Sequence, residues 1–123
     1  MASIFEATAG AAIGYVSGNG GAVTQATSKS TGVTLNTPSG QITMNGAALA
    51  DATNVNFTVT NSVIAATDVV IVNVASVGTA GAYTVQTTAV AAGSFGISVK
   101  NVSGGALSQA IVLNFAVIKA AAA

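Results

Sequence analysis

From about Thr31 onward, the sequence is a succession of short runs in which apolar and polar residues alternate. In the run TNVNFTVTN, Val55, Phe57 and Val59 fall on one side and the intervening Asn and Thr residues on the other. Successive side chains of a β-strand point to opposite faces of its sheet, so this period of two predicts a half-buried strand. Residues typical of turns separate the runs, which predicts a chain of many short strands.

Seven or eight strands are predicted, which favours an all-β fold: an antiparallel β-sandwich, with the jelly roll as one arrangement of it. The first two runs, GVTL and QITM, flank NTPSG, where Pro38 and Gly40 indicate a turn, so we expect a hairpin there. The run DVVIVNVAS, from Asp68, is apolar on both faces. It therefore predicts a strand covered on both sides, by a second sheet or by a neighbouring subunit. The remaining predicted strands are AYTVQTTAV from Ala82, SFGISVKNV from Ser94 and AIVLNFAVI from Ala110.

Residues 1–30 differ from the rest of the chain because they are rich in Ala, Gly and Ser and only weakly patterned. We expect them to form an extended N-terminal arm, and residues 31–123 to form the sandwich domain. No basic region precedes the first apolar residues and Glu6 comes early, so a secretory signal is not expected.

Charged residues make up only 5% of the chain, against roughly 25% in an average soluble domain. The three lysines and three acids cancel, while 51% of the residues are hydrophobic. A neutral, apolar chain tends to associate, so we expect this protein to exist in an assembly. No apolar run is long enough for a membrane-spanning helix, and the sequence lacks the basic surface that nucleic acid requires. Neither a membrane nor a nucleic acid is predicted as a partner.

Residues suited to catalysis or metal binding are scarce. The chain has no His and no Cys, and its carboxylates, Glu6, Asp51 and Asp68, lie far apart in the sequence. A Ser nucleophile would need a base, for which the nearest arrangement is SKS at 28–30, with no recognisable oxyanion motif beside it. We therefore predict no enzymatic activity, no catalytic residues, no metal site and no cofactor.

The run VTQATSKSTGVTLN at 23–36, with TVTNSVIAATDVVIVNV and AGAYTVQTTAV after it, resembles a group of small structural proteins of tailed bacteriophages. The resemblance implies a β-rich, usually trimeric element displayed on the virion as a head decoration or head-fibre protein. The expected function is therefore that of a capsid decoration protein on the capsid surface. The partners implied are two further copies in a homotrimer and the major capsid protein or another virion protein.

Two other functions are open at this stage. A tail-fibre or receptor-binding module of a phage would use the same fold but would be expected to expose aromatic residues to sugars. A bacterial surface-layer or fibrous subunit is the other, and it would be expected to carry a secretion signal.

Two sets of contact residues are predicted. Apolar residues in an arm that cannot build its own core are best explained by burial on the capsid or on another subunit, and these are Ile4, Phe5, Ile13, Tyr15 and Val16. The doubly apolar run predicts a trimer interface at Val70, Val72 and Val74.

Overall fold

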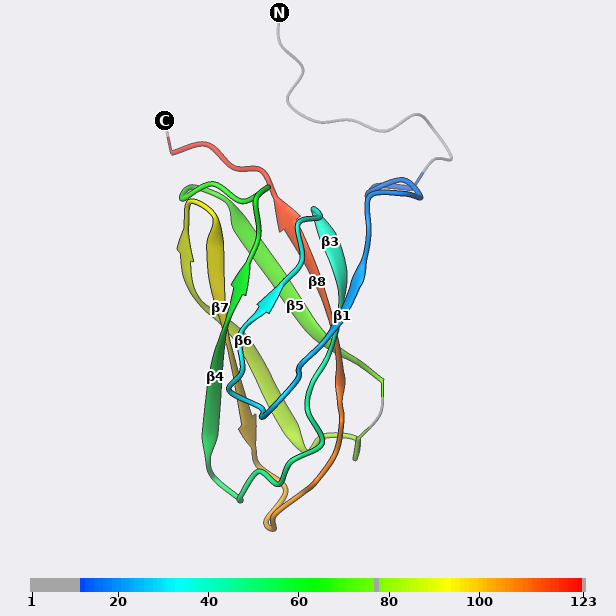
Figure 1. Ribbon diagram of the computed structural model, residues 1–123, viewed down its shortest axis with the longest axis vertical. Coiled ribbons are helices and arrows are strands. Elements are labelled where there is room, and N and C mark those ends of the chain that lie inside the picture. The colour runs from blue at the N-terminus through cyan, green and yellow to red at the C-terminus, as the bar shows by residue number, and fades with distance from the viewer. Residues whose placement is uncertain (1–11, 77, 123) are drawn as a thin grey trace, which may run out of the picture.

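The computed structural model describes residues 12–76 and 78–122 and shows two four-stranded β-sheets packed face to face (Figure 1). Sheet A has the strand order β1-β3-β8-β5 and sheet B the order β2-β4-β7-β6. The strands are β1 (Ala22–Thr24), β2 (Val33–Thr34), β3 (Ser39–Thr43), β4 (Asn54–Thr60), β5 (Val69–Ser76), β6 (Tyr83–Ala91), β7 (Ser94–Asn101) and β8 (Val112–Ile118). The described residues contain no helix, so the prediction of an all-β sandwich is confirmed.

Both sheets are mixed. Strand β1 pairs with β3 in parallel, as does β2 with β4, whereas the other four pairs are antiparallel. The expectation of antiparallel pairing therefore holds for four of the six strand pairs. It fails at one edge of each sheet, at β1 in sheet A and at β2 in sheet B. Alternation along a run predicts a strand but not the direction of the strand beside it.

The expected hairpin across NTPSG is wrong. Strand β2 belongs to sheet B and β3 to sheet A, so residues 35–38 carry the chain from one sheet to the other. The Leu35 N–H continues the pairing with β4 by donating to the Thr60 carbonyl at 3.0 Å. Strand β3 is paired with β8 and β1 in sheet A.

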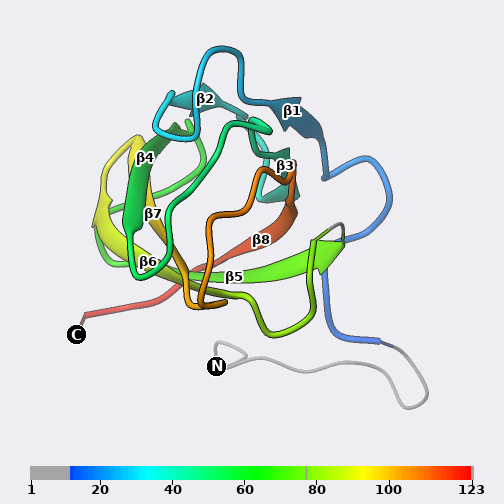
Figure 2. The same ribbon diagram turned by 90° about the horizontal axis from the view of Figure 1, so that it is seen from below.

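The chain changes sheet at every connection from β1 to β6, and again between β7 and β8. Only β6 and β7 are joined within one sheet, by the two residues Ala92 and Gly93. Gly93 has φ of 86°, a conformation that other residues adopt only at a cost. The end-on view in Figure 2 shows the crossing loops closing the ends of the sandwich.

The core lies between the sheets and is made by the inward side of each alternating strand. Phe95 of sheet B and Phe115 of sheet A meet in its middle, with ring centroids 5.3 Å apart and ring planes inclined at 57°. This tilted contact is a favourable aromatic geometry and joins the two sheets directly. The fully buried apolar residues around them include Ile42, Met44, Val59, Ile97, Val99, Ile111, Leu113 and Val117.

Buried side-chain amides hold the loops that cross between the sheets. Asn61 is completely buried and its Nδ2 donates to the carbonyls of Leu35 and Thr37, at 2.9 and 2.8 Å. Its Oδ1 accepts from the backbone N–H groups of Val63 and Ile64, at 2.8 and 3.2 Å. One side chain thus connects the β2–β3 crossing with the β4–β5 crossing.

Asn101 has the same role at the opposite end of the sandwich. It is completely buried, and its Nδ2 donates to the carbonyls of Leu49 and Gly105, both at 2.8 Å. Its Oδ1 accepts from the Ser103 N–H at 2.9 Å. The loop after β7 is thereby fastened to the segment between β3 and β4.

The sandwich begins at Ala22, inside the segment predicted to be an arm. Val23 of β1 packs against the core, and the loop after it contains the buried residues Gln25 and Lys29. The Gln25 Nε2 donates to the carbonyls of Lys29 and Thr31, at 2.9 and 3.0 Å, which closes this loop on itself. A three-residue strand is too short for its alternation to stand out, so the sequence pattern places the start too late.

Replacing Asn61 by Ala tests the role of the buried amides. The Asn61→Ala variant removes both donors and both acceptor contacts and leaves buried backbone groups without partners. We expect its free energy of unfolding to fall by about 2 kcal/mol or more, measured by urea denaturation. The matched control Asn56→Ala, at an exposed position of the adjoining strand β4, should change stability by less than about 0.5 kcal/mol. Equal effects of the two substitutions would contradict this role.

Candidate interaction surface

Exposed large apolar side chains gather at one end of one face of the molecule. Eight such residues occur in the described part of the chain, and six of them lie either on the outer face of sheet A or in residues 12–21, the lead-in to β1. The six, with their exposed fractions, are Ile13 (70%), Tyr15 (46%), Val16 (73%), Val69 (51%), Ile71 (48%) and Ile118 (45%). Large exposed apolar patches commonly mark interaction sites.

The register of β5 and β8 explains why three of these residues are neighbours. Val69 is paired with Ile118, and Ile71 with Ala116, and all four lie on the outer side of the sheet. We name these four residues the β5–β8 patch. The next outward row is polar, because Asn73 of β5 is paired with Asn114 of β8. The apolar surface therefore occupies the end of sheet A where β8 finishes and β5 begins.

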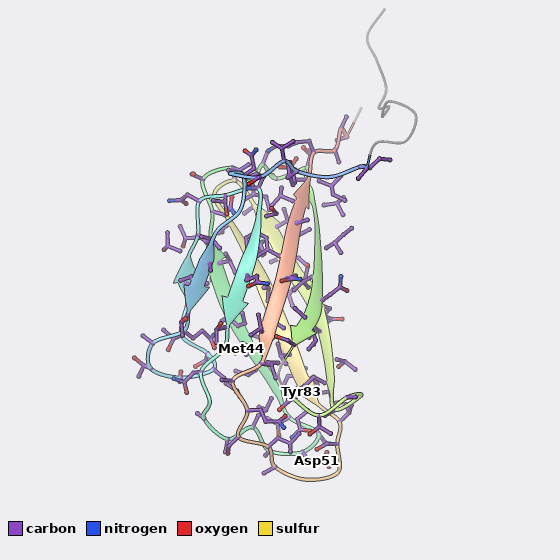
Figure 3. All side chains as sticks on the ribbon, turned by 90° about the vertical axis from the view of Figure 1, so that its right-hand side faces the viewer. Met44, Asp51 and Tyr83 are labelled. Carbon is purple, nitrogen blue, oxygen red and sulfur yellow. The ribbon has the colours of Figure 1, made fainter. Side chains whose placement is uncertain are left out.

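The lead-in is fixed at this same end. The Tyr15 hydroxyl donates to the Val117 carbonyl of β8. This carbonyl is on the edge of β8 that faces β3, where the Val117 N–H donates to the Pro38 carbonyl. Further along, the Ser39 hydroxyl donates to the Asn19 carbonyl at 3.3 Å. Figure 3, which faces sheet A, shows the lead-in passing across the upper end of the sheet. Tyr15 is thus held at the end of sheet A that carries the β5–β8 patch, and Ile13 and Val16 are its near neighbours in the sequence.

The residues predicted for capsid or subunit contact divide into two groups. Ile13, Tyr15 and Val16 are all exposed and lie in the lead-in. Ile4 and Phe5 lie outside the described residues.

The residues predicted for the trimer interface lie on the inner side of β5. Val70 is buried in the core, Val72 is half-buried, and Val74 is exposed, at the end of the strand. Their cross-strand partners include Val117 and Leu113, which are fully buried. The outward residues of this strand are instead Val69, Ile71 and Asn73.

The sequence identified the strand but not which of its sides faces outward. Both sides of DVVIVNVAS are apolar, so alternation within this run has no preferred face. Pairing with β8 decides the matter, because the β8 residues opposite Val70 and Val72 are Val117 and Phe115, both in the core. The alternation of β8 did contain an indication. Val117 is buried and the next residue, Ile118, is exposed, so their partners on β5, Val70 and Val69, face inward and outward in the same way.

An ion pair borders the patch. The Lys119 Nζ lies 2.7 Å from Oδ2 of Asp68 and also donates to the Val63 carbonyl at 2.6 Å. The hydrogen bond from Lys119, followed by the one from the Ala65 N–H, holds the pKa of Asp68 below its ordinary value of 3.8. The two charges neutralise each other, so the end of sheet A is electrostatically neutral.

Lys29 of the SKS run is a structural residue. Its side chain is buried, and its Nζ donates to the carbonyls of Asn45 and Gln109. Burial lowers the pKa of Lys29. The Ser28 hydroxyl is directed elsewhere, to the hydroxyls of Ser30 and Thr31 at 3.0 and 3.1 Å. The structure therefore does not assemble a Ser–Lys pair from this run.

The outer face of sheet B has a different character, because it is polar. Outward residues of its strands include Asn54, Asn56 and Thr58 on β4, opposite Lys100, Ser98 and Gly96 on β7. A shallow hollow of about 340 Å³ lies on this face, with Asn56, Thr58, Thr88, Ser94 and Gly96 in its lining. Among these outward positions only Lys100 is charged.

Within 12–76 and 78–122, no three His, Cys, Asp or Glu side chains are grouped so as to hold a metal ion. The same part of the chain contains no helix of the length and hydrophobicity needed to cross a membrane. No protein-family model, curated protein or solved structure matches the chain.

The Asp68–Lys119 pair predicts a specific pH dependence. Because the pKa of Asp68 is lower in the folded protein than in the unfolded chain, its contribution to stability is present above pH 3.8 and is lost as the pH falls through the folded value. We expect Asp68→Asn to be less stable than the original protein at pH 7, and the difference to shrink and close in acid. Urea denaturation of both proteins between pH 7 and pH 2 measures this. A difference that stays constant over that range would contradict the assignment.

Proposed function

We propose that this chain is a structural protein of a bacteriophage virion, a decoration protein that binds the capsid surface as a homotrimer. The observation that supports this most is the gathering of exposed apolar side chains in the lead-in and at the upper end of sheet A. Together with the resemblance of VTQATSKSTGVTLN to phage structural proteins, it favours a protein whose task is to be attached to other proteins.

Docking through this surface is driven by burial of apolar area. Complete burial of a Val, Leu or Ile side chain contributes about 1.5–3 kcal/mol relative to full exposure. Ile13 and Val16 are each more than two-thirds exposed, so covering both supplies several kcal/mol before the cost of association is subtracted. The partner is the major capsid protein or another virion protein, with an apolar surface of matching shape.

The distribution of the three lysines supports a protein partner over a nucleic acid. Lys29 is buried and Lys119 is paired with Asp68, which leaves Lys100 on the outer face of sheet B. A nucleic-acid site relies on several cations that together displace counterions from phosphates. Lys100 together with an ion-paired Lys119 does not provide such a site.

A receptor-binding module of a tail fibre is a second candidate, which the hollow on sheet B favours. Its lining offers hydroxyl and amide groups without carboxylates, which suits a neutral polyhydroxylated ligand such as a saccharide.

Immunogold electron microscopy of native particles distinguishes the two candidates by location. Labelling of the head supports decoration, labelling of the tail supports the receptor-binding module, and labelling of a bacterial surface would support the surface-layer alternative.

Substitution of the exposed lead-in residues tests docking. The double variant Ile13→Ser, Val16→Ser removes apolar side chains that have little contact with the sandwich, so it should stay folded. We expect it to bind phage particles lacking the protein at least about tenfold more weakly, a loss of about 1.4 kcal/mol or more. Co-sedimentation with those particles, at low salt and at about 1 M salt, measures the effect.

Val102→Ser is the matched control, since Val102 is an exposed apolar residue outside the lead-in and sheet A. The Gly104 N–H donates to Asp51 at 2.8 Å, which places this loop at the lower end of the sandwich, where Figure 3 labels Asp51. The control should bind normally, and the original protein should keep its binding at high salt because the docking surface is neutral. Wild-type binding by the double variant, or release by moderate salt, would refute docking through the lead-in.

A further inference from the structure

We propose that copies of this chain contact one another through the β5–β8 patch on the outer face of sheet A. This inference goes beyond the virion role and does not depend on it, since it concerns the isolated protein. It also assigns the contact to residues other than the inward-facing valines of β5. Three observations support a second copy as the occupant.

The first observation is the shape and pattern of the face. Val69, Ile71 and Ile118 project from two paired strands, with the smaller Ala116 next to Ile71 and Ile118 at one corner of the patch. Two sheets that pack face to face bury such side chains by interdigitation. The space above Ala116 can receive a bulky side chain of an identical face.

The second observation is the neutrality of the face. The patch contains no charged residue, and the nearby Lys119 and Asp68 neutralise each other. Beyond the patch lies an uncharged polar row, formed by Gln41, Asn114 and Asn73 on three neighbouring strands. Like-charge repulsion, which opposes contact between identical surfaces, is therefore absent. Amide groups both donate and accept, so this row can also pair with its own copy.

The third observation is that β5 is an edge strand with a bulge only near its end, between Val74 and Ser76. It has eight residues, contains neither Pro nor a charged residue, and has a sheet partner on one side only. On the side of β5 without a strand partner, the Thr87 hydroxyl of β6 donates to the Val70 carbonyl at 3.1 Å and so satisfies one backbone group of that edge. Natural edge strands of this length usually carry Lys or Pro, which prevent uncontrolled pairing. A second copy seated on the β5–β8 patch would cover the outward apolar side chains of β5 beside this edge.

The experiment is to measure the mass of the full chain in solution and its response to a charge in the patch. Sedimentation equilibrium at concentrations up to the order of 100 µM should give the original protein a dimer or trimer mass, a multiple of 11.7 kDa. Ile71→Lys should weaken self-association by at least about tenfold, because an assembled interface would bury an unpaired charge. Val102→Lys, which places the same charge on an exposed apolar position away from the patch, should leave the assembly unchanged.

Ile71→Thr is a second variant that keeps the β-branched shape and strand propensity, in case the lysine prevents folding. It should fold, as judged by circular dichroism, and should also associate more weakly than the original protein. A monomeric original protein, undiminished association of Ile71→Thr, or equal weakening by Val102→Lys would overturn the inference. A monomer that still binds phage particles would refute self-association, and with it the homotrimer, but would leave the proposed attachment to the virion intact.

Discussion

The structure depends on the satisfaction of buried backbone groups by neutral side-chain amides. A chain that changes sheet at nearly every connection has many loops that cross the ends of the sandwich, and their polar groups must find partners away from water. Asn61 makes four hydrogen bonds at one end and Asn101 three at the other. Amides bear both donors and acceptors, so one residue can hold two loops without bringing a charge into the interior. The loop positions, and with them the strand order, rest on these contacts.

The scarcity of charge has a second consequence, at the surface. With few ionic groups to keep it hydrated, the molecule exposes apolar side chains, and these are not spread evenly. Inward residues of β5 and β8 pack in the core, whereas their outward residues Val69, Ile71 and Ile118 are only about half covered by the described chain. Tyr15 brings the lead-in to the same place by bonding Val117. The surface available for assembly is thus a result of strand register combined with one hydrogen bond from the lead-in.

The sequence predicts the fold class well because most strands, β4 above all, show clear alternation between core and solvent. It fails where the decisive information is non-local. The run GVTL, which contains β2, is predicted as a strand, but its parallel pairing with β4 depends on residues 26 positions apart, such as Val33 and Val59. Likewise, both sides of β5 are apolar, so its outward face follows only from its pairing with β8. Val69 and Ile71 could not be separated from Val70 and Val72 by any property of the run itself.

The two outer faces of the sandwich suggest a division of roles. Sheet A has its apolar end and the lead-in beside each other, so contact between copies and attachment to a shell would use adjoining surfaces of one sheet. Sheet B, with its rows of Asn, Thr and Ser, would then remain in contact with water. A polar, nearly uncharged outer face suits a protein that is fixed in an array, because neighbouring copies neither repel nor adhere through it. The asymmetry originates in the sequence: β4 alternates apolar with polar residues, whereas β5 is largely apolar on both sides and exposes one of them.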